Sequence, residues 1–180
     1  MPYFSIIVPV YNRLGEVRDL LESLSKQTDK DFETVLVEDG STERCEPAVR
    51  EFESQVDVKY FYKENEGRSI ARNYGMERAS GEYFLFFDSD CVIPEHYIAT
   101  LKAALKANYT DCFGGPDAAH SSFSDIQKAI NYSMTSFLTT GGAERCSWRN
   151  LYPAHLIWDF HVVFGKRWAV SVKCFPKTST

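Results

Sequence analysis

Several residue patterns that define common protein classes are missing from this sequence. The five cysteines are scattered and include no Cys-x-x-Cys pair, which disfavours a zinc or redox motif and predicts reduced cytosolic thiols. No apolar run approaches the ~20 residues of a membrane-spanning helix, and the first residues resemble no secretory signal. Cations are in deficit, and the net charge of −5 disfavours general nucleic-acid binding. We therefore expect one soluble globular domain in the 180 residues.

Charge is distributed unevenly along the chain. Residues 1–142 carry a net charge of −9, whereas residues 143–180 carry +4 and contain all three tryptophans and two of the four histidines. A shift of this kind is typical of a domain boundary or a tail. The sequence therefore predicts a domain over 1–142 and an atypical tail over 143–180.

Strand and helix patterns alternate through the first 142 residues. Apolar, β-branched runs predict strands over 4–10, 32–37, 56–61, 82–87 and 111–114. Helical spacing predicts helices over 14–26, 43–53, 68–79, 94–107 and 123–137, with Ser41 or Thr42 as the cap of the second. This alternation predicts an α/β fold with a mostly parallel sheet, in which ligands bind at the carboxyl ends of the strands.

Polar clusters follow three of the predicted strands. They are Pro9 to Arg13 after the first, Glu38 to Ser41 after the second and Asp88-Ser89-Asp90 after the fourth. Turn chemistry alone also explains the first two clusters. Asp88 and Asp90 lie beside a very apolar run, where two carboxylates repel each other unless a cation joins them, and hard oxygen ligands suit Mg²⁺ or Mn²⁺. Solvated loop acids are the alternative.

Two arginines lie one turn apart where the third predicted helix begins. Gly67 precedes Arg68 and Arg72, and the N-terminus of a helix attracts anions such as a diphosphate. Solvated arginines are the alternative, although the small neighbours Ala71 and Gly75 favour a buried position for Arg72.

Two other enzyme classes are disfavoured by what surrounds these motifs. No Gly-x-Gly-x-x-Gly follows the first strand, which disfavours a dinucleotide-dependent oxidoreductase. The Asp-x-Asp motif ends the fourth strand, whereas a phosphatase of that type would carry it on the first.

The motifs together resemble family 2 glycosyltransferases, which have the Rossmann-like GT-A fold. Four segments occur in the family's order over about residues 3–142, namely 5–12, 37–41, 65–73 and 88–90. The resemblance implies metal-dependent transfer of a sugar from a nucleotide sugar, with UDP as the expected nucleotide, to an acceptor hydroxyl with inversion. It implies Mn²⁺ or Mg²⁺ as cofactor and a sugar or lipid-linked saccharide as acceptor. Polysaccharide biosynthesis in the cytoplasm, including peripheral association with the inner face of a membrane, is the setting that it implies.

The resemblance also assigns residues to the donor site. Pro9, Tyr11 and Asp39 would contact the base, with Arg13 and Glu38 as neighbours, and Arg68 and Arg72 would help to bind the base and diphosphate. Asp88, followed by Ser89, would bind the ribose or the metal-bridged diphosphate, and Asp90 would ligate the metal directly. Asp117 would contact the sugar and acceptor side, and Cys91 is not expected to be a ligand.

Residues 143–180 depart from the family. Members continue with Asn-Met-Gly-Phe, Gly-Gly-Phe and a Glu-Asp pair that carries the catalytic base, and none of these occurs here. When the codons are shifted by one base, all three can be read in order, and Trp168 followed by Ala169 then forces a glycine. We therefore expect an out-of-frame translation from about Ala143, with a genuine divergent tail as the alternative.

An out-of-frame tail would change the expected activity. The fold would lack part of its C-terminal region, the catalytic base would be unassigned, and His155 and His161 would not be functional sites. The alternative function is then a truncated, catalytically impaired fragment that binds a nucleotide sugar.

Overall fold

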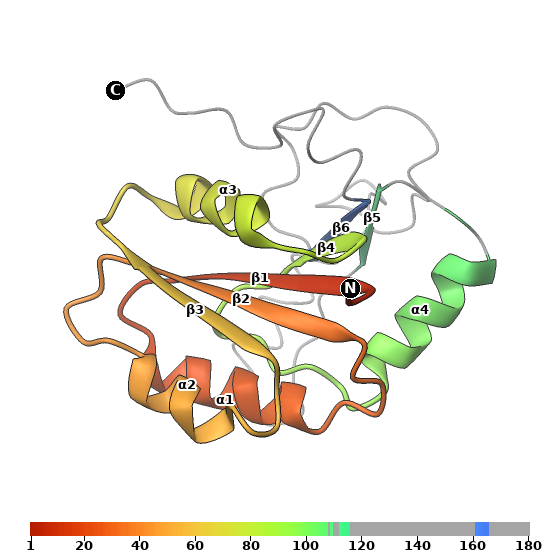
Figure 1. Cartoon of the computed structure of the whole chain (residues 1–180), viewed down its shortest axis with the longest axis horizontal. Helices are drawn as coiled ribbons and strands as arrows, with labels where there is room; N and C mark the ends of the chain where they lie inside the picture. Colours follow the sequence, from red (N-terminus) through yellow and green to blue (C-terminus); the bar gives the residue numbers. More distant parts are fainter. Residues whose placement is uncertain (108, 110–111, 116–160, 166–180) are drawn as a thin grey trace, which may run out of the picture.

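A computed structural model describes residues 1–107, 109, 112–115 and 161–165 (Figure 1). The strands are β1 (Phe4–Val10), β2 (Phe32–Asp39), β3 (Val58–Lys63), β4 (Tyr83–Phe86), β5 (Cys112–Gly115) and β6 (His161–Gly165). The helices are α1 (Leu14–Ser25), α2 (Glu46–Phe52), α3 (Arg68–Arg78) and α4 (Tyr97–Ala107). None of the helices described is long and apolar enough to cross a bilayer.

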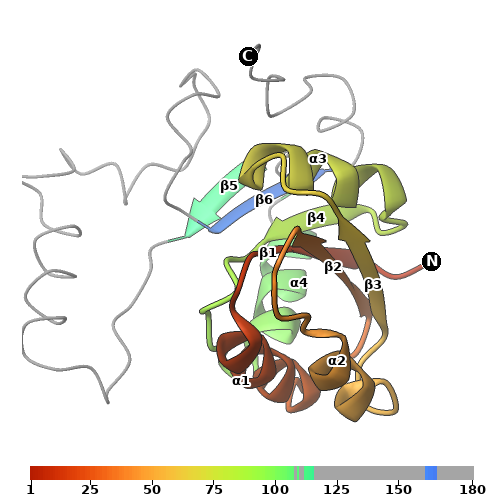
Figure 2. The same ribbon diagram turned by 90° about the vertical axis from the view of Figure 1, so that its left-hand side faces the viewer.

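The strands form one sheet in the order β3-β2-β1-β4-β6-β5. The first four of these run parallel, and β6 pairs antiparallel with both β4 and β5. Figures 1 and 2 show α3 on one face of the sheet and α1 and α2 on the other. The predicted α/β fold with a mostly parallel sheet is confirmed.

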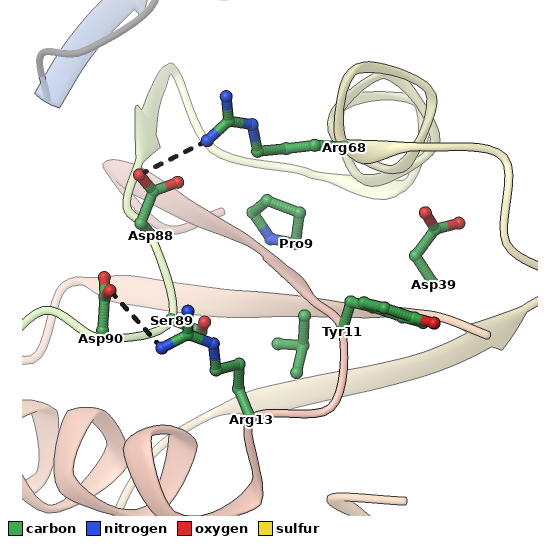
Figure 3. Close-up of a pocket in the computed structure, with 9 residues that line it drawn as sticks. Pro9, Tyr11, Arg13, Asp39, Arg68, Asp88, Ser89 and Asp90 are labelled. Carbon is green, nitrogen blue, oxygen red and sulfur yellow. Dashed lines mark ion pairs between the residues drawn. The ribbon is translucent and has the colours of Figure 1, made fainter. Parts of the chain in front are cut away.

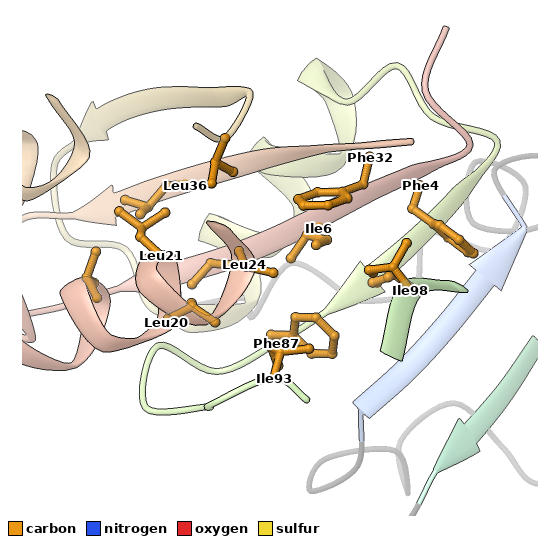
Figure 4. Close-up of a cluster of buried hydrophobic side chains, with 14 of the residues drawn as sticks. Phe4, Ile6, Leu20, Leu21, Leu24, Phe32, Leu36, Phe87, Ile93 and Ile98 are labelled. Carbon is orange, nitrogen blue, oxygen red and sulfur yellow. The ribbon is translucent and has the colours of Figure 1, made fainter. Parts of the chain in front are cut away.

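Both faces of β1 are covered, which explains why its sequence is apolar almost without interruption. Successive residues point to opposite faces, so Ile6 packs in the larger cluster with α1 and α4 (Figure 4), whereas Ile7 packs in the cluster beneath α3. Gly75 allows α3 to approach closely, because a Cβ there would lie 2.7 Å from Ile7 Cγ2. This packing fixes the N-terminus of α3 above the carboxyl ends of β1 and β2.

A buried carboxylate ties together the amino end of the sheet. Glu33 accepts hydrogen bonds from the Ser5 hydroxyl (2.6 Å) and from the backbone N–H and hydroxyl of Ser80, and it pairs with Lys59 (2.6 Å). Burial acts to raise the pKa of Glu33, but these donors outweigh it and lower the pKa to about 2. The network links β1, β2, β3 and the turn before β4, far along the strands from their carboxyl ends.

The second helix differs from its prediction. It begins at Glu46, with Cys45 at the N-cap and no side-chain cap, so the expectation that Ser41 or Thr42 caps it is wrong. Ser41 Oγ instead accepts from the Asn12 N–H (2.9 Å), and Asn12 Oδ1 accepts from the Thr42 N–H (2.8 Å). These bonds connect the loop after β1 to the loop after β2.

Other boundaries shift by a few residues. The third strand ends at Lys63 rather than at residue 61, and α4 begins at Tyr97, three residues beyond Pro94. The helix expected over 123–137 lies outside the described residues. Within the tail, residues 161–165 pair through their backbone as β6. Backbone pairing does not test the reading frame, which stays a prediction.

Candidate functional site

The carboxyl ends of β1, β2 and β4 surround a hollow of about 210 Å³ (Figure 3). Its lining consists of Pro9, Val10, Tyr11, Arg13, Asp39, Arg68, Asp88, Ser89 and Asp90. Because parallel strands end at one edge of the sheet, residues far apart in the sequence converge there. Eight of these nine lining residues were predicted for the donor site, and Val10 is the one that was not.

Asp39 is held in place by the loop that leads from β3 into α3. Its Oδ1 accepts from Lys63 Nζ (2.7 Å) and the Glu66 N–H (3.0 Å), and its Oδ2 accepts from the Gly67 N–H (2.8 Å). Burial acts to lower the pKa of Lys63, but its bonds to Asp39 and Glu66 outweigh that effect and raise it. The result is a fixed carboxylate that still borders the hollow.

Tyr11 lies across from Asp39 on the rim of the hollow (Figure 3). Tyr11 is 53% exposed although it directly follows a buried strand. The next residue, Asn12, has φ of 52°, a left-handed conformation that Asn tolerates better than most residues. The turn at Asn12 and its bonds to the β2 loop therefore present an aromatic face beside the hollow.

Asp88 is paired with two arginines of α3. Arg72 Nη2 lies 2.8 Å from Asp88 Oδ1, and Arg68 Nη1 lies 4.0 Å from Oδ2. The buried position expected for Arg72 is confirmed, since only 8% of its side chain is exposed, and this burial lowers the pKa of its guanidinium. Arg72 does not line the hollow itself, so it acts on the hollow through Asp88.

Asp90 is the more exposed of the two motif carboxylates, at 56% of its side chain. Arg13 Nη1 lies 3.8 Å from Asp90 Oδ2 and also pairs with Glu16 at 2.9 Å. Ser89 lies between the two acids on the wall of the hollow. The dashed lines in Figure 3 mark the Arg13–Asp90 and Arg68–Asp88 pairs.

The carboxylates of Asp88 and Asp90 fit a hard divalent cation that is coordinated by carboxylate and phosphate oxygens together. Within the described residues no group of three or more His, Cys, Asp or Glu gathers as a closed metal cage. Mg²⁺ and similar ions are commonly held by one or two carboxylates together with water and substrate phosphates. Asp88 already has an arginine on Oδ1, so Asp90 is the carboxylate better placed to hold such an ion.

Glu38 does not line the hollow, although it was expected beside the base. It is completely buried and accepts from the Cys45 N–H (3.2 Å) and the Tyr60 hydroxyl. Neighbours in a strand face opposite sides, so Glu38 lies among α2 and β3 while Asp39 lies toward α3. Burial, followed by the effect of Glu38, raises the pKa of both Cys45 and Tyr60.

Sequence reasoning missed Lys63, which contacts Asp39 directly. The two residues are register partners in the parallel pair of β2 and β3. A lysine at the end of the third strand could have pointed to this contact, but that strand was predicted to end at residue 61, two residues before Lys63. Asp117 lies outside the described residues. Among the described cysteines, Cys45 is buried and Cys91 is partly buried.

A Rossmann-like sheet with this charged hollow at its carboxyl edge is the architecture of GT-A, nucleotide-sugar-binding glycosyltransferases. The chain belongs to glycosyl transferase family 2, because the model of that family matches residues 5–166. It is thus an enzyme domain of the glycosyltransferase class, and its resemblance to the family is confirmed.

Known proteins similar to this chain agree with that assignment. Glycosyltransferase GlyA of Streptococcus pneumoniae is 43% identical over 99 residues, which are 54% of this chain and 14% of GlyA. A Campylobacter jejuni GalNAc(5)-diNAcBac-PP-undecaprenol beta-1,3-glucosyltransferase is 31% identical over 117 residues, covering 63% of this chain and 38% of that protein. The structure of S. aureus TarS 1–349 in complex with UDP-GlcNAc superposes with a TM-score of 0.63 at 30% identity, over 69% of this chain and 36% of that 1–349 chain. In each of these comparisons the matched segment covers well under half of the other protein.

Proposed function

We propose that the hollow binds a UDP-sugar and that the domain transfers the sugar to an acceptor hydroxyl with inversion. The observation that carries the proposal is the convergence of Asp39, Asp88 and Asp90 with two arginines on one hollow. The complex of TarS with UDP-GlcNAc supports a uridine nucleotide as the donor.

The base would lie between Tyr11 and Asp39, above Pro9. Asp39 is a carboxylate acceptor among fixed donors, so it suits a base that offers a ring N–H. The exposed ring of Tyr11 offers a flat apolar surface for stacking. These two contacts would orient the nucleotide so that its diphosphate points toward α3 and the Asp88–Asp90 segment.

The diphosphate would lie among the cations of the hollow. Arg68 stands at the N-terminus of α3, where the helix dipole also favours an anion. Asp90, with Asp88, would hold Mn²⁺ or Mg²⁺, which when bound neutralises charge on the leaving diphosphate. Arg72 would keep Asp88 oriented toward the ribose or the phosphates.

In the transfer step the acceptor hydroxyl attacks the anomeric carbon from the face opposite the diphosphate. A carboxylate base takes the hydroxyl proton as the bond from the anomeric carbon to the phosphate oxygen breaks. No described residue is assigned as this base. Because the Campylobacter relative is named for an undecaprenol-linked substrate, we propose a lipid-linked saccharide as acceptor, used in polysaccharide biosynthesis at the cytoplasmic face of a membrane.

A second candidate function is a donor-binding fragment that transfers no sugar. The absence of the family's Glu-Asp pair from residues 143–180 favours it. We propose that the donor domain covers 1–142 and that the reading frame changes near residue 143. Sequencing the coding DNA across codons 135–180 and about 60 codons beyond tests this, since an uninterrupted frame without the shifted motifs would refute it.

Thermal unfolding with and without UDP and Mn²⁺ tests donor binding in the whole chain. A ligand at one hundred times its dissociation constant stabilises the native state by about 2.7 kcal/mol, which raises the midpoint of a domain this size by roughly 5–10 °C. Asp90→Asn should abolish the part of the shift that requires Mn²⁺. An unchanged midpoint at saturating UDP and Mn²⁺ would refute the donor site. Donor hydrolysis or sugar transfer then separates the enzyme from the inactive fragment.

A further inference from the structure

Lys63 occupies an unusual position for a lysine at the end of an edge strand. Only 9% of its side chain is exposed, and its ammonium lies 2.7 Å from Asp39 Oδ1 and 2.8 Å from Glu66 Oε2. Its remaining hydrogen bond goes to the carbonyl oxygen of Glu64. All three ammonium donors are therefore used within the protein, and Lys63 itself offers nothing to a ligand.

Asp39, in contrast, retains capacity to accept a hydrogen bond. A carboxylate has about four acceptor positions, and here Lys63, the Glu66 N–H and the Gly67 N–H fill three of them. The donors contact both oxygens, so the carboxylate cannot rotate without losing at least one bond. Asp39 lines the hollow, which leaves its remaining acceptor position available there.

Lys63 also separates two negative charges. Asp39 and Glu66 both contact the ammonium, and without it their carboxylates would face each other across the space that it vacates. The Glu66 side chain is 56% exposed and can move into water, so the loss of the ammonium falls mainly on the buried Asp39, whose Oδ1 then keeps only the Glu66 N–H as a donor. Removing the ammonium would therefore loosen Asp39 from its present orientation, even though the backbone N–H donors remain.

We infer that Lys63 is a positioning residue that fixes Asp39 as an acceptor facing the nucleobase, and that it thereby sets the base selectivity of the donor site. The inference rests on the proposed function. Uracil presents a ring N–H at N3 and can donate to Asp39, whereas the N3 of cytosine is itself an acceptor and meets a carboxylate unfavourably. Lys63 thus favours UDP over CDP without touching either base.

Isothermal titration of the whole chain with UDP and with CDP, each with Mn²⁺, tests this role. Lys63→Met should weaken UDP binding about tenfold or more, as expected for a charge-assisted hydrogen bond that loses its geometry. CDP binding should change less than about threefold, so the UDP-to-CDP preference falls. Lys63→Arg keeps a cationic donor for Asp39 and Glu66, so it should recover part of the UDP-to-CDP preference lost in Lys63→Met.

Lys59→Met provides the matched control, because it removes a lysine–carboxylate pair from the same strand at the opposite end of the sheet. It should lower the thermal midpoint but leave the UDP-to-CDP preference unchanged. If Lys63→Met fails to fold, Lys63→Gln, which retains a neutral amide donor group, carries the same prediction.

Two results would overturn the inference alone: an equal loss of UDP and CDP binding in the Lys63 variant, or no recovery in Lys63→Arg. Either would mean that Lys63 only supports the structure. A wild-type chain that binds neither nucleotide would overturn the proposed donor site and this inference with it.

Discussion

The carboxylates of Glu38 and Asp39 are adjacent in the sequence but lie on opposite faces of the sheet. Glu38 is fully buried against Cys45 and Tyr60, whereas Asp39 contacts Lys63 and borders the hollow. One acid therefore links β2 to β3 and to the start of α2, and the other belongs to the candidate donor site. Their separation gives two distinct outcomes for two conservative substitutions.

Asp39→Asn and Glu38→Gln should differ in their effect on UDP binding. The amide at position 39 replaces one acceptor oxygen with a donor, so UDP binding should weaken at least tenfold, and stability should also fall because Lys63 and two backbone N–H groups bond to this carboxylate. Glu38→Gln should lower stability by about 1–3 kcal/mol, because the buried Cys45 N–H and Tyr60 hydroxyl lose a charged acceptor. Calorimetric titration and denaturant unfolding of both variants measure these effects. Equal loss of UDP affinity in both would contradict the division between the two faces.

Glu33 should make the stability of the chain depend on pH in the acidic range. Its pKa of about 2 lies below the value of 4.5 expected in the unfolded chain, so the native state binds the proton less readily. The stabilisation is therefore complete above pH 4.5 and is lost as pH falls toward 2, by up to about 3 kcal/mol. Urea unfolding between pH 3 and 6 measures it. Glu33→Gln should flatten this dependence, and an equally steep profile in that variant would assign it to other carboxylates.

Much of this structure follows from local sequence patterns. Alternating strand and helix patterns predict the parallel sheet. Because ligands bind at the carboxyl ends of parallel strands, the sequence also predicts that Tyr11, Asp39 and Asp90 lie together, as they do in the hollow. Other features depend on long-range register. Lys63 gains its role only because β3 pairs with β2 so that Asp39 and Lys63 are partners, and no local pattern reports that pairing. The Glu38 side chain could have been placed by strand alternation, which predicts that adjacent residues face opposite sides.

Arg13 should compete with a divalent cation for Asp90. Its guanidinium lies 3.8 Å from the Asp90 carboxylate, and both side chains are about half exposed. An exposed ion pair contributes at most about 1 kcal/mol, so Arg13→Gln should raise the affinity for Mn²⁺ alone by up to about fivefold. A titration with Mn²⁺ in the absence of nucleotide, monitored by electron paramagnetic resonance, measures this affinity. Arg18→Gln in α1, where the arginine pairs with Glu51, should leave Mn²⁺ affinity unchanged. Weaker Mn²⁺ binding in Arg13→Gln would show that Arg13 supports the metal rather than opposes it.

Gly40 should be intolerant of any side chain, because two independent constraints meet there. Its φ is 76°, which L-residues rarely adopt, and a Cβ would lie 2.6 Å from the backbone nitrogen of Asn65. The β2 turn would then push against the loop that carries the donors to Asp39, so Gly40→Ala should cost about 2 kcal/mol or more of stability.

The same substitution should also weaken UDP binding, since Glu66 and Gly67 follow Asn65 directly in that loop. Gly15→Ala is the matched control, because a Cβ there meets nothing within 4 Å and the residue lies within α1. Alanine favours a helix over glycine, so this variant should gain up to about 1 kcal/mol. Denaturant unfolding and UDP titration of both variants decide the matter. A Gly40→Ala chain with wild-type stability and UDP affinity would mean that the loop over Asp39 can move aside freely, which would contradict the fixed carboxylate on which the donor site depends.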